Sequence, residues 1–195
     1  MDKTIDFYNQ NACDFIAGTI AADMSDARNR FLSYVEENGR ILDWGCGSGR
    51  DALYFQSHGY DVVATDASKA LCQKLLEKAD FSVRCECFDE LKEQAFFDGI
   101  WACASLLHVG IDDLPRLFQK ARNALKPDGY LYVSFKYGEF QGERNGRYFT
   151  DLTEVSMCSL LNKVKKLEIV EEWTTTDVRP DRNEKWLNVI MKRED

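Results

Sequence analysis

Apolar residues recur along this chain with two different periods, which separate helical segments from strands. Within 25–38, Ala27, Phe31 and Val35 recur at the spacing of an amphipathic helix, whereas 61–65 is a short apolar run rich in β-branched residues. The pattern predicts helices over 4–18, 25–38, 50–58, 68–79, 113–125 and 151–163. It predicts strands over 40–44, 61–65, 82–87, 98–104, 130–136, 167–178 and 185–192.

Strand and helix alternate five times with short connections, which favours a parallel sheet because each right-handed crossover lays its helix on a sheet face. The last two strands have no helix between them, so one of them must run antiparallel to its neighbour. We expect 167–178 to run parallel to 130–136. The predicted fold is therefore α/β, Rossmann-like and doubly wound. Its mostly parallel seven-stranded sheet carries helices on both faces and has an antiparallel last strand.

The length of 195 residues fits one domain, in which 1–38 would form N-terminal cap helices and 39–195 a Rossmann-like core. The net charge of −8 makes nucleic acid an unlikely partner, since it repels phosphate. The sequence shows neither a leader pattern nor an apolar run of roughly 20 residues, so we expect a cytoplasmic protein with no membrane partner. Its oligomeric state is expected to be a monomer or a homodimer.

Seven cysteines and two histidines raise the question of metal or redox chemistry. The cysteines are scattered, no CxxC pair occurs, and His58 and His108 lie far apart in the sequence. Small buried thiols in a reducing compartment fit this pattern better than a metal cluster. We expect no metal.

The chemically informative segment is Gly45-Cys46-Gly47-Ser48-Gly49, directly after a strand. Three alternating glycines let the backbone turn sharply and approach a ligand where a Cβ would collide. Asp66 ends the next strand, where a carboxylate can accept hydrogen bonds from both hydroxyls of a ribose. Together they predict a nucleoside pocket.

The type of nucleoside follows from the neighbouring residues. A dinucleotide site needs G-x-G-x-x-G, and Arg50 stands where the last glycine would be. Asp43 adds a negative charge that a pyrophosphate disfavours but that a ligand with an amino group and a sulfonium tolerates. A nicotinamide-dependent oxidoreductase is therefore disfavoured.

At these positions the chain resembles the class I S-adenosylmethionine-dependent methyltransferases. Residues 43–49 match their first motif, Asp66 their second-strand acid, 97–101 their fourth strand and 125–131 the entry to their fifth. The Gly-x-Gly-Arg-Asp continuation at Gly47–Asp51 resembles the small tellurite-resistance-like members. The resemblance implies S-adenosyl-L-methionine as cofactor, bound by Asp43, Gly45, Cys46, Gly47, Gly49, Asp66, Ala67, Phe88, Asp89 and Ala104. For Asp89, N-capping of the following helix is the alternative.

The acceptor site is harder to locate, because methyl transfer from a sulfonium chiefly needs an aligned acceptor and exclusion of water. His108 follows the fourth strand and can take a proton from an attacking atom, or else simply fill the wall of the pocket. Tyr8 lies in a segment that resembles the lid helix of small-molecule methyltransferases, or is an ordinary packing residue. These two are the catalytic candidates.

Substrate-binding candidates are Arg147, Tyr148, Arg179 and Arg182, which follow the fifth and sixth strands. The arginines can bind an anionic acceptor or lie on the surface as solvated charges. The predicted function is methyl transfer to a small-molecule acceptor, anionic ones included. A tRNA or protein methyltransferase and a non-catalytic binding module remain alternatives.

Overall fold

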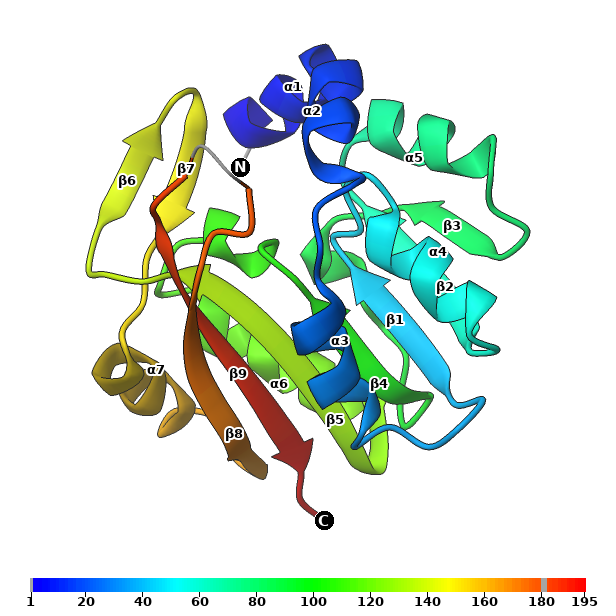
Figure 1. The fold of residues 1–195 in the computed structure, drawn as a ribbon. Coiled ribbons are helices and arrows are strands. Elements are labelled where there is room, and N and C mark those ends of the chain that lie inside the picture. Colours follow the sequence, from blue (N-terminus) through cyan, green and yellow to red (C-terminus); the bar gives the residue numbers. More distant parts are fainter. Residues whose placement is uncertain (1, 180–181) are drawn as a thin grey trace.

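The structure is a computed structural model that describes residues 2–179 and 182–195. Its main strands are β1 (Arg40–Trp44), β2 (Asp61–Asp66), β3 (Ser82–Cys85), β4 (Phe97–Ala102), β5 (Leu125–Lys136), β8 (Leu167–Thr176) and β9 (Lys185–Arg193). They form a seven-stranded sheet in the order β3-β2-β1-β4-β5-β9-β8 (Figure 1). The first five pair in parallel, and β9 is antiparallel to both β5 and β8. The predicted fold class is confirmed, including an antiparallel last strand and a β8 that runs parallel to β5.

Helices cover both faces of the sheet and create two cores. One face carries α3 (Ser25–Leu32), α4 (Arg50–Ser57) and α5 (Lys69–Leu76), and the other carries α6 (Leu114–Ala124) and α7 (Glu154–Leu161). On the first face Phe31 and Phe55 pack on Trp101, whose ring stacks on that of Tyr132 at 3.9 Å. On the second face Leu117 and Phe118 of α6 are buried with the apolar side chains of α7. The sheet is thus buried on both sides, which explains the apolar run of β4.

The carboxyl ends of the parallel strands are covered by a separate group of elements. Helices α1 (Asp2–Gln10) and α2 (Ala12–Thr19) lie across this edge, next to a hairpin of β6 (Gln141–Arg144) and β7 (Arg147–Thr150) (Figure 1). We call α1 and α2 the cap. The side-chain oxygen of Asn9 accepts hydrogen bonds from Ser68 Oγ at 2.9 Å and from the backbone N–H of Ala70 at 3.1 Å. Thr4 Oγ1 accepts the backbone N–H of Tyr148 at 3.1 Å. The cap is therefore tied both to the start of α5 and to the hairpin.

Local details differ from the sequence prediction where polar residues interrupt a pattern. The helix expected over 4–18 breaks at Asn11, whose side chain donates to the carbonyl of Phe7 at 2.8 Å. The helix expected over 25–38 ends at Leu32. The hairpin was not predicted, although Asn145 and Gly146 have φ of +49° and +77°, the conformation of a two-residue hairpin turn.

The N-cap residue of α7 also differs from the one that the sequence pattern indicates. A capping box of Asp151 and Glu154 would fit the S/T/D-x-x-E signature, but Thr153 is the N-cap and exchanges hydrogen bonds with Ser156. Asp151 instead forms an ion pair with Arg144 of the hairpin. Ser68, at the start of the helix predicted over 68–79, is the N-cap of α5 and accepts the N–H of Leu71 at 3.3 Å.

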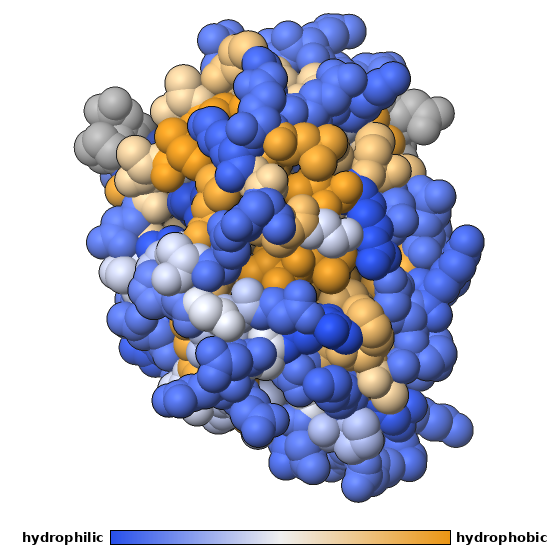
Figure 2. Space-filling view, turned by 90° about the vertical axis from the view of Figure 1, so that its right-hand side faces the viewer, coloured by the Kyte–Doolittle hydropathy of each residue, from blue (hydrophilic) through white to orange (hydrophobic). Residues whose placement is uncertain are grey.

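The surface beside the β3 edge is mostly hydrophilic, with apolar side chains gathered in its upper half (Figure 2). Leu76, the last residue of α5, is one of the large apolar side chains that remain exposed. Among the described residues, no helix combines the length and the apolar character needed to cross a bilayer.

Candidate active site

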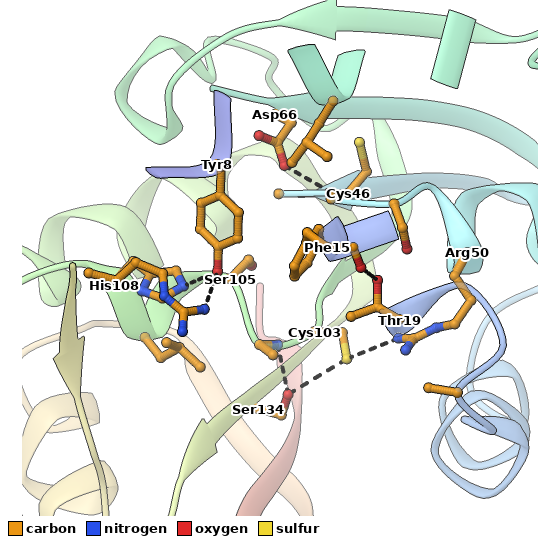
Figure 3. Close-up of a pocket in the computed structure, with 18 of the residues that line it drawn as sticks. Tyr8, Phe15, Thr19, Cys46, Arg50, Asp66, Cys103, Ser105, His108 and Ser134 are labelled. Carbon is orange, nitrogen blue, oxygen red and sulfur yellow. Dashed lines mark hydrogen bonds between the residues drawn. The ribbon is translucent and has the colours of Figure 1, made fainter. Parts of the chain in front are cut away.

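A cavity of about 450 Å³ lies between the cap and the carboxyl ends of the parallel strands (Figure 3). Strand order reverses between β1 and β4, and the loops that follow these two strands both line the cavity. Such a switch point is where open α/β sheets bind ligands. Of the residues predicted from the sequence, those that line it are Tyr8, Asp43, Gly45, Cys46, Gly47, Asp66, Ala67, Phe88, Ala104, His108, Arg147, Arg179 and Arg182. Gly49, Asp89 and Tyr148 are not among the lining residues.

The three glycines of the loop have different neighbours. All have positive φ, at +85° for Gly45, +54° for Gly47 and +74° for Gly49. A Cβ on Gly45 would lie 2.4 Å from the Cβ of Ser105, and one on Gly47 would lie 3.0 Å from the ring of Phe15. These two glycines therefore keep the loop close to the β4 end and to the cap.

Gly49 serves packing rather than the cavity. A Cβ there would lie 2.3 Å from Cδ1 of Leu75, which is buried on α5. The third glycine thus lets α4 begin directly against α5. Its predicted role in binding the cofactor is at most indirect.

The carboxylate of Asp66 is held in place by the backbone. Its Oδ2 accepts the N–H of Gly47 at 2.9 Å, and its Oδ1 accepts the N–H of Ser68 at 2.8 Å. Burial raises the pKa of Asp66, and the two N–H groups partly oppose this effect. Each carboxylate oxygen has further lone pairs, so the group can still accept the two hydroxyls of a ribose. The site therefore fits the nucleoside predicted from the sequence.

Asp43 lies beneath the glycine loop with 3 % of its surface exposed. Its Oδ2 accepts the N–H of Ala52, in the first turn of α4, at 3.0 Å. Burial, followed by the negative charge of Asp51, raises the pKa of Asp43 well above its usual range. A cationic group bound nearby would favour its ionised form. This environment suits a ligand with an ammonium or sulfonium charge.

The predicted adenine contacts separate in the structure. Phe88 lines the cavity and packs edge-on against Trp44, with ring centroids 5.2 Å apart. Asp89 instead forms an ion pair with Arg116 and has an exposed side chain. Asp89 lies within the short 3-10 helix Phe88–Glu90, whose N-cap is Cys87, so Asp89 does not cap it either.

The loop after β4 contains a strained residue at the cavity wall. Ala104 has φ of +51°, a conformation that residues with a Cβ rarely adopt, and its N–H donates to Ser134 Oγ at 2.8 Å. Ser105 Oγ donates to the carbonyl of Trp44 at 2.7 Å. These bonds fix the β4 loop against β1 and β5. Ser105, Ser134 and Phe15 line the cavity but were missed, because isolated serines and a cap phenylalanine carry no signal of their own.

Tyr8 and His108, the two catalytic candidates, are in direct contact (Figure 3). The phenol oxygen of Tyr8 lies 2.8 Å from Nε2 of His108, and Nδ1 of His108 lies 2.7 Å from the carbonyl oxygen of Tyr148. A carbonyl only accepts, so Nδ1 carries the proton and Nε2 accepts the hydroxyl of Tyr8. Burial lowers the pKa of His108 to about 4, with Arg147 and Lys136 adding to the effect, while the hydrogen bond to Tyr148 opposes it. The imidazole is therefore neutral at physiological pH.

The arginine candidates differ in their partners. Arg147 donates to Tyr8 at 3.3 Å and lies over the ring of Phe7 at 4.5 Å, but it forms no ion pair with any described residue. The buried Nε of Arg147 also has no hydrogen-bond partner among the described residues. The guanidinium of Arg179 is bound to Asp177 through two hydrogen bonds of 2.8 and 2.5 Å, whereas Arg182 is exposed at the rim. Of the three arginines, Arg147 is thus the one with a buried Nε that can still donate hydrogen bonds to a ligand.

Comparison with known proteins agrees with this site. Residues 16–154 match the family model described as a methyltransferase domain. Phosphoethanolamine N-methyltransferase of Plasmodium falciparum is 28% identical over 137 residues, which are 62% of this chain and 49% of that protein. The chain spans about half or less of the length of the curated relatives it matches.

Two solved structures show the same fold along nearly the whole chain. The 1,6-didemethyltoxoflavin-N1-methyltransferase of Burkholderia thailandensis, bound to S-adenosylhomocysteine, has a TM-score of 0.82 at 21% identity. The match covers 100% of this chain and 88% of that one. The [4+2]-cyclase SpnF has a TM-score of 0.75 at 14% identity, covering 97% of this chain and 94% of its own.

The chain belongs to the methyltransferase-domain family. It carries a class I S-adenosylmethionine-dependent methyltransferase domain, whose cofactor is S-adenosyl-L-methionine. When bound, this cofactor supplies a methyl group on a positively charged sulfur.

Proposed function

We propose that the enzyme methylates a small-molecule acceptor held between Tyr8, His108 and Arg147. The observation that carries this proposal is the cap, which lies over the cavity and lines it. The cap is tied down at three points: by Asn9 to the start of α5, by Thr4 to the hairpin and by Tyr8 to His108. A cap held by these bonds favours a small acceptor over a nucleotide of tRNA or a protein side chain, because a bulkier substrate needs more access to the cavity.

The roles proposed for the cofactor-binding residues follow from their surroundings. Asp66 and Ala67 would bind the ribose, and Phe88 would pack against the adenine. Asp43, Gly45, Cys46, Gly47 and Ala104 would surround the methionine part. Gly49 would act only through the packing of α4 on α5, and Asp89 could reach the cofactor only after leaving Arg116.

The acceptor is proposed to carry an acidic group, which Arg147 would bind with help from Arg179 or Arg182 at the rim. A charged donor surrounded by rings and without a carboxylate partner among the described residues favours an anionic ligand. The Plasmodium relative is named for phosphoethanolamine, which contains a phosphate group. Tyr148 would contribute through its backbone alone, since its carbonyl orients His108.

Other expectations from the sequence belong to the same proposal. Residues 1–38 would be the N-terminal segment, of which α1 and α2 form the cap, and 39–195 the Rossmann-like core of one methyltransferase domain, acting in the cytoplasm as a monomer or homodimer. The likeness to the tellurite-resistance-like members rests on Gly47–Asp51. There Arg50 and Asp51 form an ion pair of 2.6 Å at the start of α4.

The proposal is tested with cofactor binding and a panel of paired acceptors. Calorimetry should show binding of S-adenosylhomocysteine and none of NAD. With methyl-labelled cofactor, small acids such as hydroxybenzoates should be labelled at least tenfold faster than the matching amides. Labelling of tRNA or protein alone would favour a macromolecular substrate, and cofactor binding without any labelled product would favour a non-catalytic module.

A further inference from the structure

We infer that Tyr8 and His108 form a proton route out of the acceptor site, and that the charge of Arg147 controls it, so that an acidic acceptor activates its own deprotonation. This inference rests on the proposed function, because it assigns a proton path to the same acceptor. It also predicts which acceptors the enzyme prefers.

The direction of the route follows from the hydrogen bonds. Since His108 Nδ1 donates to the carbonyl of Tyr148, its Nε2 must accept, and the hydroxyl proton of Tyr8 points to it. Arg147 Nη1 donates to the same phenol oxygen at 3.3 Å. A phenol oxygen has two lone pairs, so one remains for an O–H or N–H of the acceptor. Tyr8 is therefore arranged to receive a proton on one side while it gives its own proton to His108.

The transfer is balanced at every atom. The proton of the acceptor O–H or N–H moves to the phenol oxygen of Tyr8, and the electron pair of that bond stays on the acceptor atom. The hydroxyl proton of Tyr8 moves to Nε2 of His108, so Tyr8 ends neutral and the imidazole becomes an imidazolium. Its Nδ1–H remains bonded to Tyr148, and the extra proton later leaves to water.

The charged and titratable groups around His108 decide whether this transfer is favourable. Arg147 from β7 and Lys136 from β5 lower the pKa of His108, after the larger effect of burial. Lys136 has a counter-charge in Glu184 at 2.9 Å, and burial raises the pKa of Tyr8, which keeps that group neutral. The ring of Phe149 packs against the imidazole with centroids 4.8 Å apart.

Among the described residues, Arg147 is thus the cation of this group that has no counter-charge. An imidazolium formed beside a free guanidinium places two cations together in a desolvated site, which is unfavourable. An acidic group bound to Arg147 cancels that charge and raises the pKa of His108. A neutral acceptor of the same shape cannot do so, and its proton remains in place.

The test measures protonation of His108 by NMR, without any cofactor turnover. The chain has two histidines, and replacement of His58 assigns the second signal. With a pKa of about 4, His108 should be about one tenth protonated at pH 5, rising to about one half in Arg147→Gln. Arg30→Gln removes the same charge from α3, where the side chain is 42% exposed, and should leave His108 unchanged.

A second measurement uses the unaltered protein, so that the test does not depend on folding of the variant. Benzoate, a simple carboxylate probe, should raise the protonated fraction of His108 at pH 5 about fivefold, and benzamide should have no effect. The inference is overturned if Arg147→Gln folds and leaves His108 unchanged, or if benzoate and benzamide act alike.

Calorimetry separates this inference from the proposed function. Arg147→Gln should bind S-adenosylhomocysteine within about twofold of the unaltered protein, because its role is toward the acceptor. If the variant loses that affinity while benzoate leaves His108 unchanged, Arg147 binds the carboxylate of the cofactor. The methyltransferase assignment would then stand and the proton route would fall.

Discussion

The indole Nε1 of Trp101 donates to Oδ2 of Asp51 at 3.0 Å, joining the middle of the sheet to the first turn of α4. The same carboxylate, 4 % exposed, lies 2.6 Å from Arg50 and 3.5 Å from Arg28. Asp51 therefore compensates two largely buried guanidinium groups. The residue that ends the Gly-x-Gly-Arg-Asp sequence is a structural anchor beneath the cavity.

Replacement of Asp51 should accordingly be costly. Asp51→Ala leaves Arg50 and Arg28 without their counter-charge, and we expect it to lower the free energy of unfolding by about 3–5 kcal/mol. Urea unfolding measures this value. Asp26→Ala removes the exposed partner of Arg30 and should change stability far less. Similar losses in both variants would contradict the anchoring role.

Gly49 should tolerate no side chain. Gly49→Ala combines a positive φ with a 2.3 Å approach to Leu75, and we expect a loss of about 2–4 kcal/mol in the free energy of unfolding. Gly18→Ala is the matched control, because nothing lies within 4 Å of its Cβ position in α2. That change should stabilise the protein by up to about 1 kcal/mol. Equal melting temperatures for the two variants would refute the packing argument.

Asp66 should be needed for cofactor affinity. Asp66→Asn replaces one acceptor oxygen by a donor, so we expect the affinity for S-adenosylhomocysteine to fall at least tenfold in calorimetry. Asp61→Asn, at the exposed start of the same strand, should leave this affinity unchanged. An unaltered affinity in Asp66→Asn would remove this residue from the proposed site.

His108 should make the fold sensitive to acid. Its pKa is about 4 in the folded protein, against 6.5 for the unperturbed group, so the unfolded chain binds the proton first as pH falls. Above pH 6.5 the imidazole is neutral in both the folded and the unfolded state, so it does not change the free energy of unfolding with pH. Between pH 6.5 and 4 this free energy falls progressively by about 3 kcal/mol.

Urea unfolding at pH 7 and pH 4.5 measures this loss. His108→Gln should lose less stability than the unaltered protein between these two values, while His58→Gln should behave like the unaltered protein. Carboxylates titrate in all three proteins, so only the difference between them is diagnostic. Parallel pH curves for all three would show that His108 is not buried in its neutral form.

Most of the fold could be predicted from the sequence because its signals are local. Each signal indicates the structure of its own segment. Examples are the glycines after β1, the Asp at the end of β2 and the apolar run of β4. The hairpin shows the limit: Asn145-Gly146 is a strong turn signal, but the flanking residues are charged and lack an alternating apolar pattern.

The site was harder to predict because its contacts join distant segments. Tyr8 and His108 were both candidates, yet no spacing indicates that residues 100 positions apart form a hydrogen bond. Asp89 matched a motif, and only the structure shows that Arg116 engages it. The lack of an acidic partner for Arg147 among the described residues likewise cannot be read from the sequence, because it depends on which side chains the fold brings to the cavity.

The guanidinium of Arg147, which has no acidic partner in the part of the chain that the structure describes, has a practical consequence for substrate screening. Acetate, citrate and similar buffers would compete for the same position and mask weak acceptors. Assays in amine buffers with chloride kept low would leave that position open, and thermal-shift screens should then respond first to acids.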